Sequence, residues 1–214
     1  MVYDFKQKQR ALYRPSKKPS LVSVPRMTYL TVYGSGDPNQ TDGEYQHALE
    51  LLYSLAYTIK MSKMGDYQPT GYFDFVVPPL EGFWWQPGVK GVDYQHKETF
   101  HFISAIRMPD FVTPEVFQWA IAEAAAKKKL NFSPVKLTLI EEGQCAQIMH
   151  VGPYDDEPAT VTKLYHFIEQ VGYQTDYSAC RHHHEIYLSD PRRTKPENLK
   201  TLIRIPIKSI SKCD

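Results

Sequence analysis

The feature that most constrains the fold is an order of predicted elements that occurs once in each half of the 214-residue chain. In the first half, a run of β-branched and aromatic residues predicts a strand over 21–34, and apolar residues at the helical period predict a helix over 43–60. We expect Asp42 to cap this helix. Two more strand patterns follow at 71–77 and 98–107. The first half therefore has the order β-α-β-β.

The second half repeats this order. A strand is predicted over 145–152, a helix over 159–172, and two strands over 182–190 and 199–207. Between the two units, a capping threonine and a proline at the first helical position predict one more helix, over 113–129.

The repeated order predicts an α+β fold. Two pseudo-symmetric β-α-β-β modules would form an antiparallel sheet, with the helices on one face and a concave ligand cleft on the other. Residues 1–20 form a basic N-terminal arm, expected to be a solvated tail, and residues 21–208 form a single domain with repeats at about 21–130 and 135–208. The segment "PPLEGFWWQPG" (78–88) is rich in proline and glycine and is predicted to be irregular.

Charge and hydropathy exclude several classes of partner. Lysines and arginines number 25 against 24 acidic residues, a formal net charge of +1, so there is no overall field to attract nucleic acid or an anionic membrane. No apolar run approaches a signal peptide or the ~20 residues of a membrane span. The three cysteines lack disulfide or zinc-site spacing. We expect a cytoplasmic monomer or weak dimer that contacts neither nucleic acid nor membrane.

The stretch "RHHHEIYLSDPRR" carries the candidate functional acid. If it is an extended strand, His183, Glu185 and Tyr187 share one face. Ile186 and Leu188 share the other face and are expected to pack against the helix-covered core. This alternation predicts that Glu185 and Tyr187 point into the cleft. The alternative is that Glu185 is solvated or held in a salt bridge.

Aromatic residues make up 13% of the chain, and tyrosine and tryptophan suit surfaces that are apolar on one side and wet on the other. Trp84 and Trp85, with Tyr33 and Tyr154, are candidates for the walls of a slot that binds a planar aromatic guest. A guest with a positive charge would also pair with Glu185 and gain cation–π attraction. The alternative is that these rings fill the core.

A second acid is expected beside the first. In the repeat, Asp74 occupies the position of Glu185. Two carboxylates that face one apolar space raise the pKa of one of them, so a proton donor and a proton acceptor coexist at neutral pH. The alternative is that Asp74 only holds a nearby backbone group.

A metal site is a further interpretation of the histidine-rich stretch. His183 and Glu185 lie two residues apart on one face, and His150 could supply a third ligand. The chain has no H-x-x-x-H, no H-E-x-x-H and no cysteine pair at ligand spacing. We therefore expect His183 to line the ligand site, with no metal and no cofactor.

The segments "QIMHVGPYDDEPATVTKLYHFI", "HEIYLSDPRR" and "DFVVPPLEGFWW" resemble the GyrI-like small-molecule-binding family over about residues 20–208. The resemblance implies a tandem pair of strand-helix-strand-strand modules. It also implies that Glu185 is the characteristic acid of the cleft, which in drug-sensing relatives complements cationic aromatic ligands. The family includes effector domains of multidrug-responsive regulators, gyrase-inhibitor proteins, and stand-alone proteins, some of which hydrolyse cyclopropane-bearing DNA alkylators.

Two functions follow from these residues and this resemblance. In the first, an enzyme opens a strained ring by adding water: Glu185 orients and deprotonates the water, and Tyr187 stabilises the developing phenolate. In the second, a non-catalytic protein binds and sequesters xenobiotics. A third function, inhibition of gyrase through a protein contact, rests on kinship alone. The segment "PPLEGFWW" is most similar to the stand-alone branch and favours the enzyme.

Overall fold

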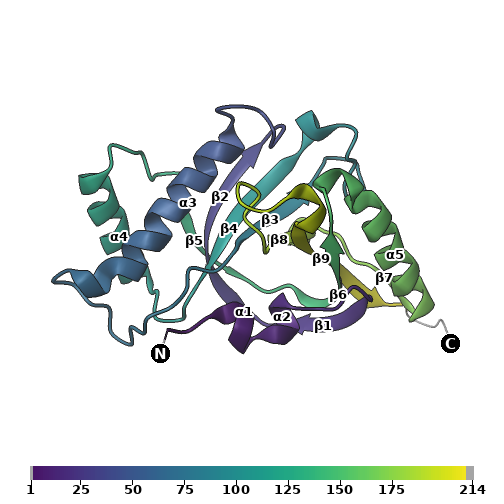
Figure 1. Ribbon diagram of the computed structural model, residues 1–214, viewed down its shortest axis with the longest axis horizontal. Coiled ribbons are helices and arrows are strands. Elements are labelled where there is room, and N and C mark those ends of the chain that lie inside the picture. Colours follow the sequence, from purple (N-terminus) through teal and green to yellow (C-terminus); the bar gives the residue numbers. More distant parts are fainter. Residues whose placement is uncertain (1, 211–214) are drawn as a thin grey trace.

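The computed structural model describes residues 2–210 and is built on one antiparallel sheet of nine strands (Figure 1). The strand order is β1-β6-β9-β8-β3-β4-β2-β5, and β7 pairs with β9 outside this path. The strands are β1 (Ser20–Val24), β2 (Met27–Ser35), β3 (Leu80–Trp85), β4 (His101–Met108), β5 (Lys136–Ile140), β6 (Gly143–Val151), β7 (Tyr173–Thr175), β8 (His183–Tyr187) and β9 (Lys200–Ser209).

Three long helices accompany the sheet, and two short ones form the arm. They are α1 (Phe5–Lys8), α2 (Arg10–Tyr13), α3 (Glu44–Lys60), α4 (Pro114–Lys127) and α5 (Glu157–Gln170). As predicted, Thr113 caps α4 by accepting a hydrogen bond from the Val116 amide. The predicted cap of α3 is wrong: Gly43 is the N-cap residue, and Asp42 takes a left-handed turn with φ of 56°. Across residues 2–210, no helix combines the length and the apolar character that crossing a bilayer requires.

The sheet has the predicted α+β, pseudo-symmetric architecture. The units β2-α3-β3-β4 and β6-α5-β8-β9 contribute strands in mirrored order and join where β3 pairs with β8. Each half also lends an edge strand to the other, because β1 pairs with β6 and β5 pairs with β2. The two halves therefore form one continuous sheet.

The positions of prolines explain two differences between the predicted strands and those in the structure. The predicted strand over 71–77 is not regular: Phe75 makes only an isolated bridge to Tyr3. The strand of this unit is β3, inside the segment expected to be irregular, because the prolines flank it rather than interrupt it. The single strand predicted over 21–34 is divided into β1 and β2 at Pro25, which has no amide hydrogen for a ladder.

Both long helices of the repeat pack on the same face of the sheet. Apolar residues of α3 contact β2 and β4, and those of α5 contact β6 and β9. Each fully buried Leu or Ile side chain at these contacts contributes roughly 1.5–3 kcal/mol. Figure 1 shows α3 and α5 apart, with the central strands between them. The middle of this face is therefore left uncovered.

The N-terminal arm packs against the opposite face, contrary to the expectation of a solvated tail. Tyr13 is only 1% exposed. The Arg204 guanidinium donates to the backbone carbonyl of Leu12 at 2.7 Å, and the Gln147 amide donates to that of Ala11 at 2.8 Å. Buried donors of the sheet need these carbonyls, so the arm is part of the fold.

Beneath the arm lies a buried ionic cluster centred on His184. Its Nδ1 lies 2.9 Å from Glu142 Oε2, its Nε2 lies 3.0 Å from Glu81 Oε2, and its ring stacks on Phe83 at 3.9 Å. Burial opposes the charged imidazolium, but the two carboxylates outweigh it and raise the pKa of His184. Burial likewise opposes the Glu142 carboxylate, yet His184 and Arg204 lower the pKa of Glu142 to about 2.

This cluster makes stability depend on pH. A raised folded-state pKa means that the stabilisation is fully present below about pH 6.5 and is lost as the pH rises through the folded pKa. His184→Asn should lower the free energy of unfolding by about 3 kcal/mol at pH 6, measured by urea denaturation. The difference from wild type should shrink at pH 9. His166→Asn, on the exposed side of α5, is the control. An equal difference at both pH values would contradict this assignment.

Candidate functional site

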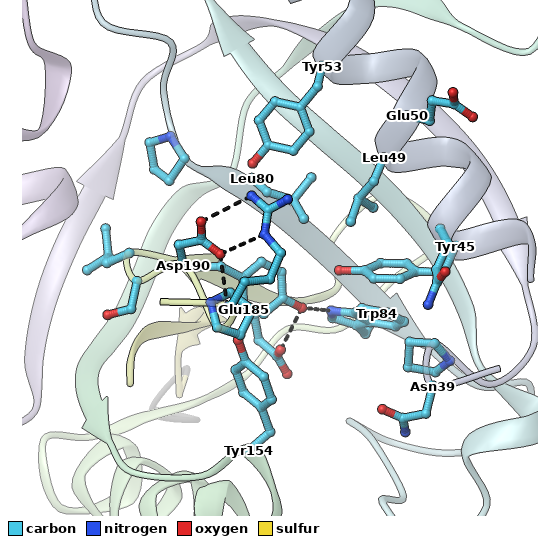
Figure 2. Close-up of a pocket in the computed structure, with 18 of the residues that line it drawn as sticks. Asn39, Tyr45, Leu49, Glu50, Tyr53, Leu80, Trp84, Tyr154, Glu185 and Asp190 are labelled. Atoms are coloured by element: carbon cyan, nitrogen blue, oxygen red, sulfur yellow. Dashed lines mark hydrogen bonds and ion pairs between the residues drawn. The ribbon is translucent and has the colours of Figure 1, made fainter. Parts of the chain in front are cut away.

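A cavity of about 1170 Å³ opens on the helix-bearing face, between α3 and α5 (Figure 2). Its floor is formed by β3 and β8 and one wall by α3, and further parts of the lining come from the start of α5 and from the loops around residues 92–100 and 188–192. The cleft was expected on the face opposite the helices. It lies on the helix face instead, because α3 and α5 cover the outer strands and leave the two central ones open.

The floor is held by a hydrogen-bond chain that crosses the junction of the two halves. Trp84 Nε1 donates to the Tyr187 hydroxyl at 3.0 Å, and that hydroxyl donates to Glu185 Oε2 at 2.9 Å (Figure 2). Gly82 is the register partner of Glu185. A Cβ at Gly82 would lie 2.5 Å from Trp84 Nε1 and 3.0 Å from the Tyr187 hydroxyl. Only glycine leaves room for this chain.

A buried histidine fixes the other oxygen of Glu185. His183 Nε2 lies 3.0 Å from Glu185 Oε1, and the His183 side chain is fully buried. Its Nδ1 has no hydrogen-bond partner among residues 2–210. A proton on Nε2 lets His183 donate to Glu185, and Nδ1 is then the unpaired ring nitrogen. Glu185 thus accepts from both sides while remaining 8% exposed to the cavity.

A second carboxyl group, which the sequence analysis missed, lines the same cavity. Glu157 is the first residue of α5 and is 1% exposed. Burial, and then the nearby Glu185, raise the pKa of Glu157 well above its usual range. A helix N-terminus favours a carboxylate, but burial and the nearby Glu185 outweigh this effect on the pKa of Glu157. The signal was its place in "PYDDEP", at the start of a predicted helix.

Aromatic rings form the sides of the acidic end. The ring of Tyr45 lies 5.4 Å from that of Trp84, and Tyr154 meets Tyr187 edge-on at 5.9 Å. Burial raises the pKa of Tyr154 to about 12. Burial, and then Glu185 and Glu157, also raise the pKa of Tyr94, whose hydroxyl has no partner among the described residues. These phenols are therefore neutral at physiological pH.

The structure brings part of the predicted site together. Trp84, Tyr154, Glu185 and Tyr187 line the cavity, and His183 lies directly behind Glu185. As predicted, Glu185 and Tyr187 share one face of their strand. That face is the helix-bearing one, so the expectation that Ile186 marks the helix side is wrong, whereas Leu188, beyond the end of β8, lines the cavity.

Three predicted ligand-binding residues lie elsewhere. Trp85 follows Trp84 in β3, so it faces the opposite side, where it stacks on His101 and His182 at 5.6 and 4.3 Å. Tyr33 is 52% exposed on that side as well. Asp74 lies outside the cavity. It forms ion pairs with Lys60, the last residue of α3, and with Lys63, which follows this helix. Its alignment with Glu185 fails because β3, not the segment around Asp74, pairs with β8.

The three consecutive histidines face different surroundings. His182 stacks on Trp85, His183 holds Glu185, and His184 lies in the cluster beneath the arm. His150, the third metal ligand considered above, is bonded to Thr160 and to a backbone carbonyl. Within the described part of the chain, no group of three or more potential ligands is gathered for a metal ion.

Comparison with known proteins identifies the fold. The pattern of the GyrI-like small molecule binding domain matches residues 17–208. The chain belongs to this GyrI-like family. Two crystal structures from Listeria innocua are similar to the GyrI-like chain. An uncharacterized conserved protein is 48% identical, with a TM-score of 0.91 and coverage of 96% of this chain and 100% of that one. A hydrolase is 47% identical, with a TM-score of 0.87 and the same coverage.

A more distant likeness shows the fold alone. The EcmrR C-terminal domain is 12% identical, with a TM-score of 0.56, over 90% of this chain and 98% of that domain. No match was found among curated protein sequences.

The role of Gly82 can be tested through the fluorescence of the floor. In a protein whose other two tryptophans, Trp85 and Trp119, are replaced by phenylalanine, Gly82→Ala should shift Trp84 emission to longer wavelength. The new methyl group displaces the indole from its buried position, at a cost of about 1–3 kcal/mol in stability. Gly65→Ala is the control, because a Cβ there meets only one atom at ordinary contact distance. An unchanged spectrum would show that the floor tolerates a side chain.

Proposed function

We propose that this GyrI-like protein is a hydrolase that binds planar aromatic compounds and opens a strained, electrophilic ring by adding water. The observation that carries the proposal is the placement of Glu157, whose pKa is raised, in the same aromatic-lined cavity as Glu185, which accepts hydrogen bonds. The 47% identical Listeria protein described as a hydrolase supports it.

The aromatic residues supply the binding energy in this proposal. A flat guest stacks against Trp84 and Tyr45, where stacking contributes roughly 1–3 kcal/mol per ring by analogy with nucleic-acid bases. A positive charge on the guest gains from Glu185 and from the ring faces around it. The cavity is large enough for a drug-sized ligand.

The proposed reaction is the hydrolysis of a cyclopropane fused to a cyclohexadienone. Glu185 accepts a proton from water while the water oxygen bonds to the ring methylene carbon. The cyclopropane C–C bond breaks, and its electron pair moves into the conjugated ring to give a phenolate. Glu157 donates a hydrogen bond or its proton to that oxygen, and Tyr187 holds Glu185 in place. The product is a phenol heavier than the substrate by one water.

Mass spectrometry of the product tests the role of Glu185. Wild-type protein, incubated with a cyclopropane-bearing planar alkylator, should form the product that has gained one water. Glu185→Gln should slow this reaction by about 100-fold or more, because the amide cannot accept the proton. Glu169→Gln, on the exposed side of α5, is the matched control and should keep the wild-type rate.

The same experiment separates catalysis from binding alone. If the alkylator is recovered unchanged but quenches Trp84 fluorescence, the protein is a non-catalytic binder of xenobiotics, and the hydrolase proposal is wrong.

The pH dependence of the rate tests the role of Glu157. Since its pKa is raised and its protonated form is the donor, kcat should fall as the pH rises through that pKa. Glu157→Gln keeps a neutral donor of the same shape, so this variant should retain turnover. Its kcat should no longer decrease at alkaline pH. Glu157→Ala should be slow at every pH. If kcat of Glu157→Gln still decreased at alkaline pH as in the wild type, the decrease would arise from the titration of another group.

A further inference from the structure

The cavity has two ends of different charge. Its acidic end contains Glu157 and Glu185 beside Tyr45 and Trp84. Figure 2 shows the cavity continuing along α3 past Leu49 toward Tyr53, away from Trp84. The far end is lined by Ser54 and Tyr57 of α3, by the segment 77–79, and by Lys6 and Lys128.

The two lysines come from elements far apart in the sequence. Lys128 follows α4, and its ammonium donates to the Ser54 hydroxyl at 2.9 Å. Lys6 belongs to α1 of the arm. The arm is held here because Tyr3 exchanges backbone hydrogen bonds with the chain around Phe75, just before the segment 77–79. The docked arm is therefore what brings Lys6 to the cavity.

The charges of these lysines are not neutralised by the protein. Among residues 2–210, no carboxylate lies within ion-pair distance of Lys6 or Lys128. The other cations of the lining are compensated: Lys97 pairs with Asp155 at 3.0 Å and Arg192 with Asp190 at 3.0 Å. The far end thus carries two free positive charges, opposite to the acidic end of the same cavity.

The spacing of the two ends follows from α3. Tyr45 stands at the acidic end and Ser54 at the basic end, nine residues further along the helix. At 1.5 Å per residue, the ends are about 14 Å apart. The walls between them contain Leu49, Leu80 and Leu188, together with Glu50 and the Arg192–Asp190 ion pair.

We infer that the basic end is a second subsite, which binds an anionic group, a carboxylate or a phosphate, on the tail of an elongated ligand whose aromatic head lies at Trp84 and Glu185. This inference rests on the proposed function for the position of the head. The ligand class it names is an extended aromatic compound with an anion about 14 Å from its planar end. The arm is then part of the binding site through Lys6.

Two probes that differ only in tail charge test the inference. One is a naphthamidine with a flexible chain that ends in a carboxylate about 14 Å from the amidine, and the other ends in the corresponding carboxamide. Isothermal titration calorimetry at low salt should show that the carboxylate binds up to about tenfold more tightly to the wild-type protein, since two partly exposed ion pairs each contribute modestly. The preference should fall as salt is raised.

A matched pair of double variants identifies the groups responsible. Lys6→Ala with Lys128→Ala should bind the two probes equally. Lys8→Ala with Lys129→Ala removes the same charge from exposed positions that do not line the cavity, and should keep the preference. Unchanged thermal midpoints establish that all variants fold.

The possible outcomes separate this inference from the proposed function. Equal affinity of the wild-type protein for both probes, or a preference that survives loss of Lys6 and Lys128, overturns the subsite and leaves the proposed hydrolase untouched. Failure of both probes to bind contradicts the proposed binding site for the aromatic head. The inferred anion subsite is then contradicted as well, because its position depends on that site. Loss of turnover in Glu185→Gln with the tail preference intact supports both.

Discussion

The pairing of β3 with β8 is the constraint on which the rest of the structure depends. This antiparallel junction unites the two β-α-β-β units and sets Gly82 opposite Glu185. Since the side-chain period of a strand is two, a slip of one residue would turn Trp84 and Glu185 away from each other. The missing side chain at Gly82 leaves the space in which Trp84, Tyr187 and Glu185 form their chain. The junction of the halves is therefore also the floor of the cavity.

The two faces of the sheet accommodate buried carboxyl groups in opposite ways. Beneath the arm, Glu142 remains charged because His184 and Arg204 lie against it. On the helix face, Glu157 forms no ion pair with any residue from 2 to 210, and burial raises its pKa. Ion pairing makes the first face a structural anchor for the arm. The second face places two carboxyl groups in one cavity, which the proposed hydrolysis would use as proton donor and proton acceptor.

The sequence predicted the repeated architecture and which side chains of β8 share a face, because hydrophobic periodicity is local and strong there, but it assigned Glu185 to the side of the sheet without helices. It failed at β3, whose flanking prolines and central glycine are typical of a loop. That error misplaced the repeat and moved the second acid to Asp74. The raised pKa of Glu157 could not be predicted, because it depends on burial and on the approach of Glu185, which lies on a later strand of the same unit. The packing of the arm depends on Arg204 and Gln147, which no local pattern connects to residues 11 and 12.

The central claim is that the uncovered middle of the helix face, at the β3–β8 junction, is where the small molecule binds. The most direct measurement is a crystal structure of the protein with a planar aromatic amidine bound. The account predicts the ring against Trp84 and Tyr45, with the amidine beside Glu185. Density for the ring on the opposite face, against Trp85 and His182, with an empty cavity between α3 and α5, would contradict it.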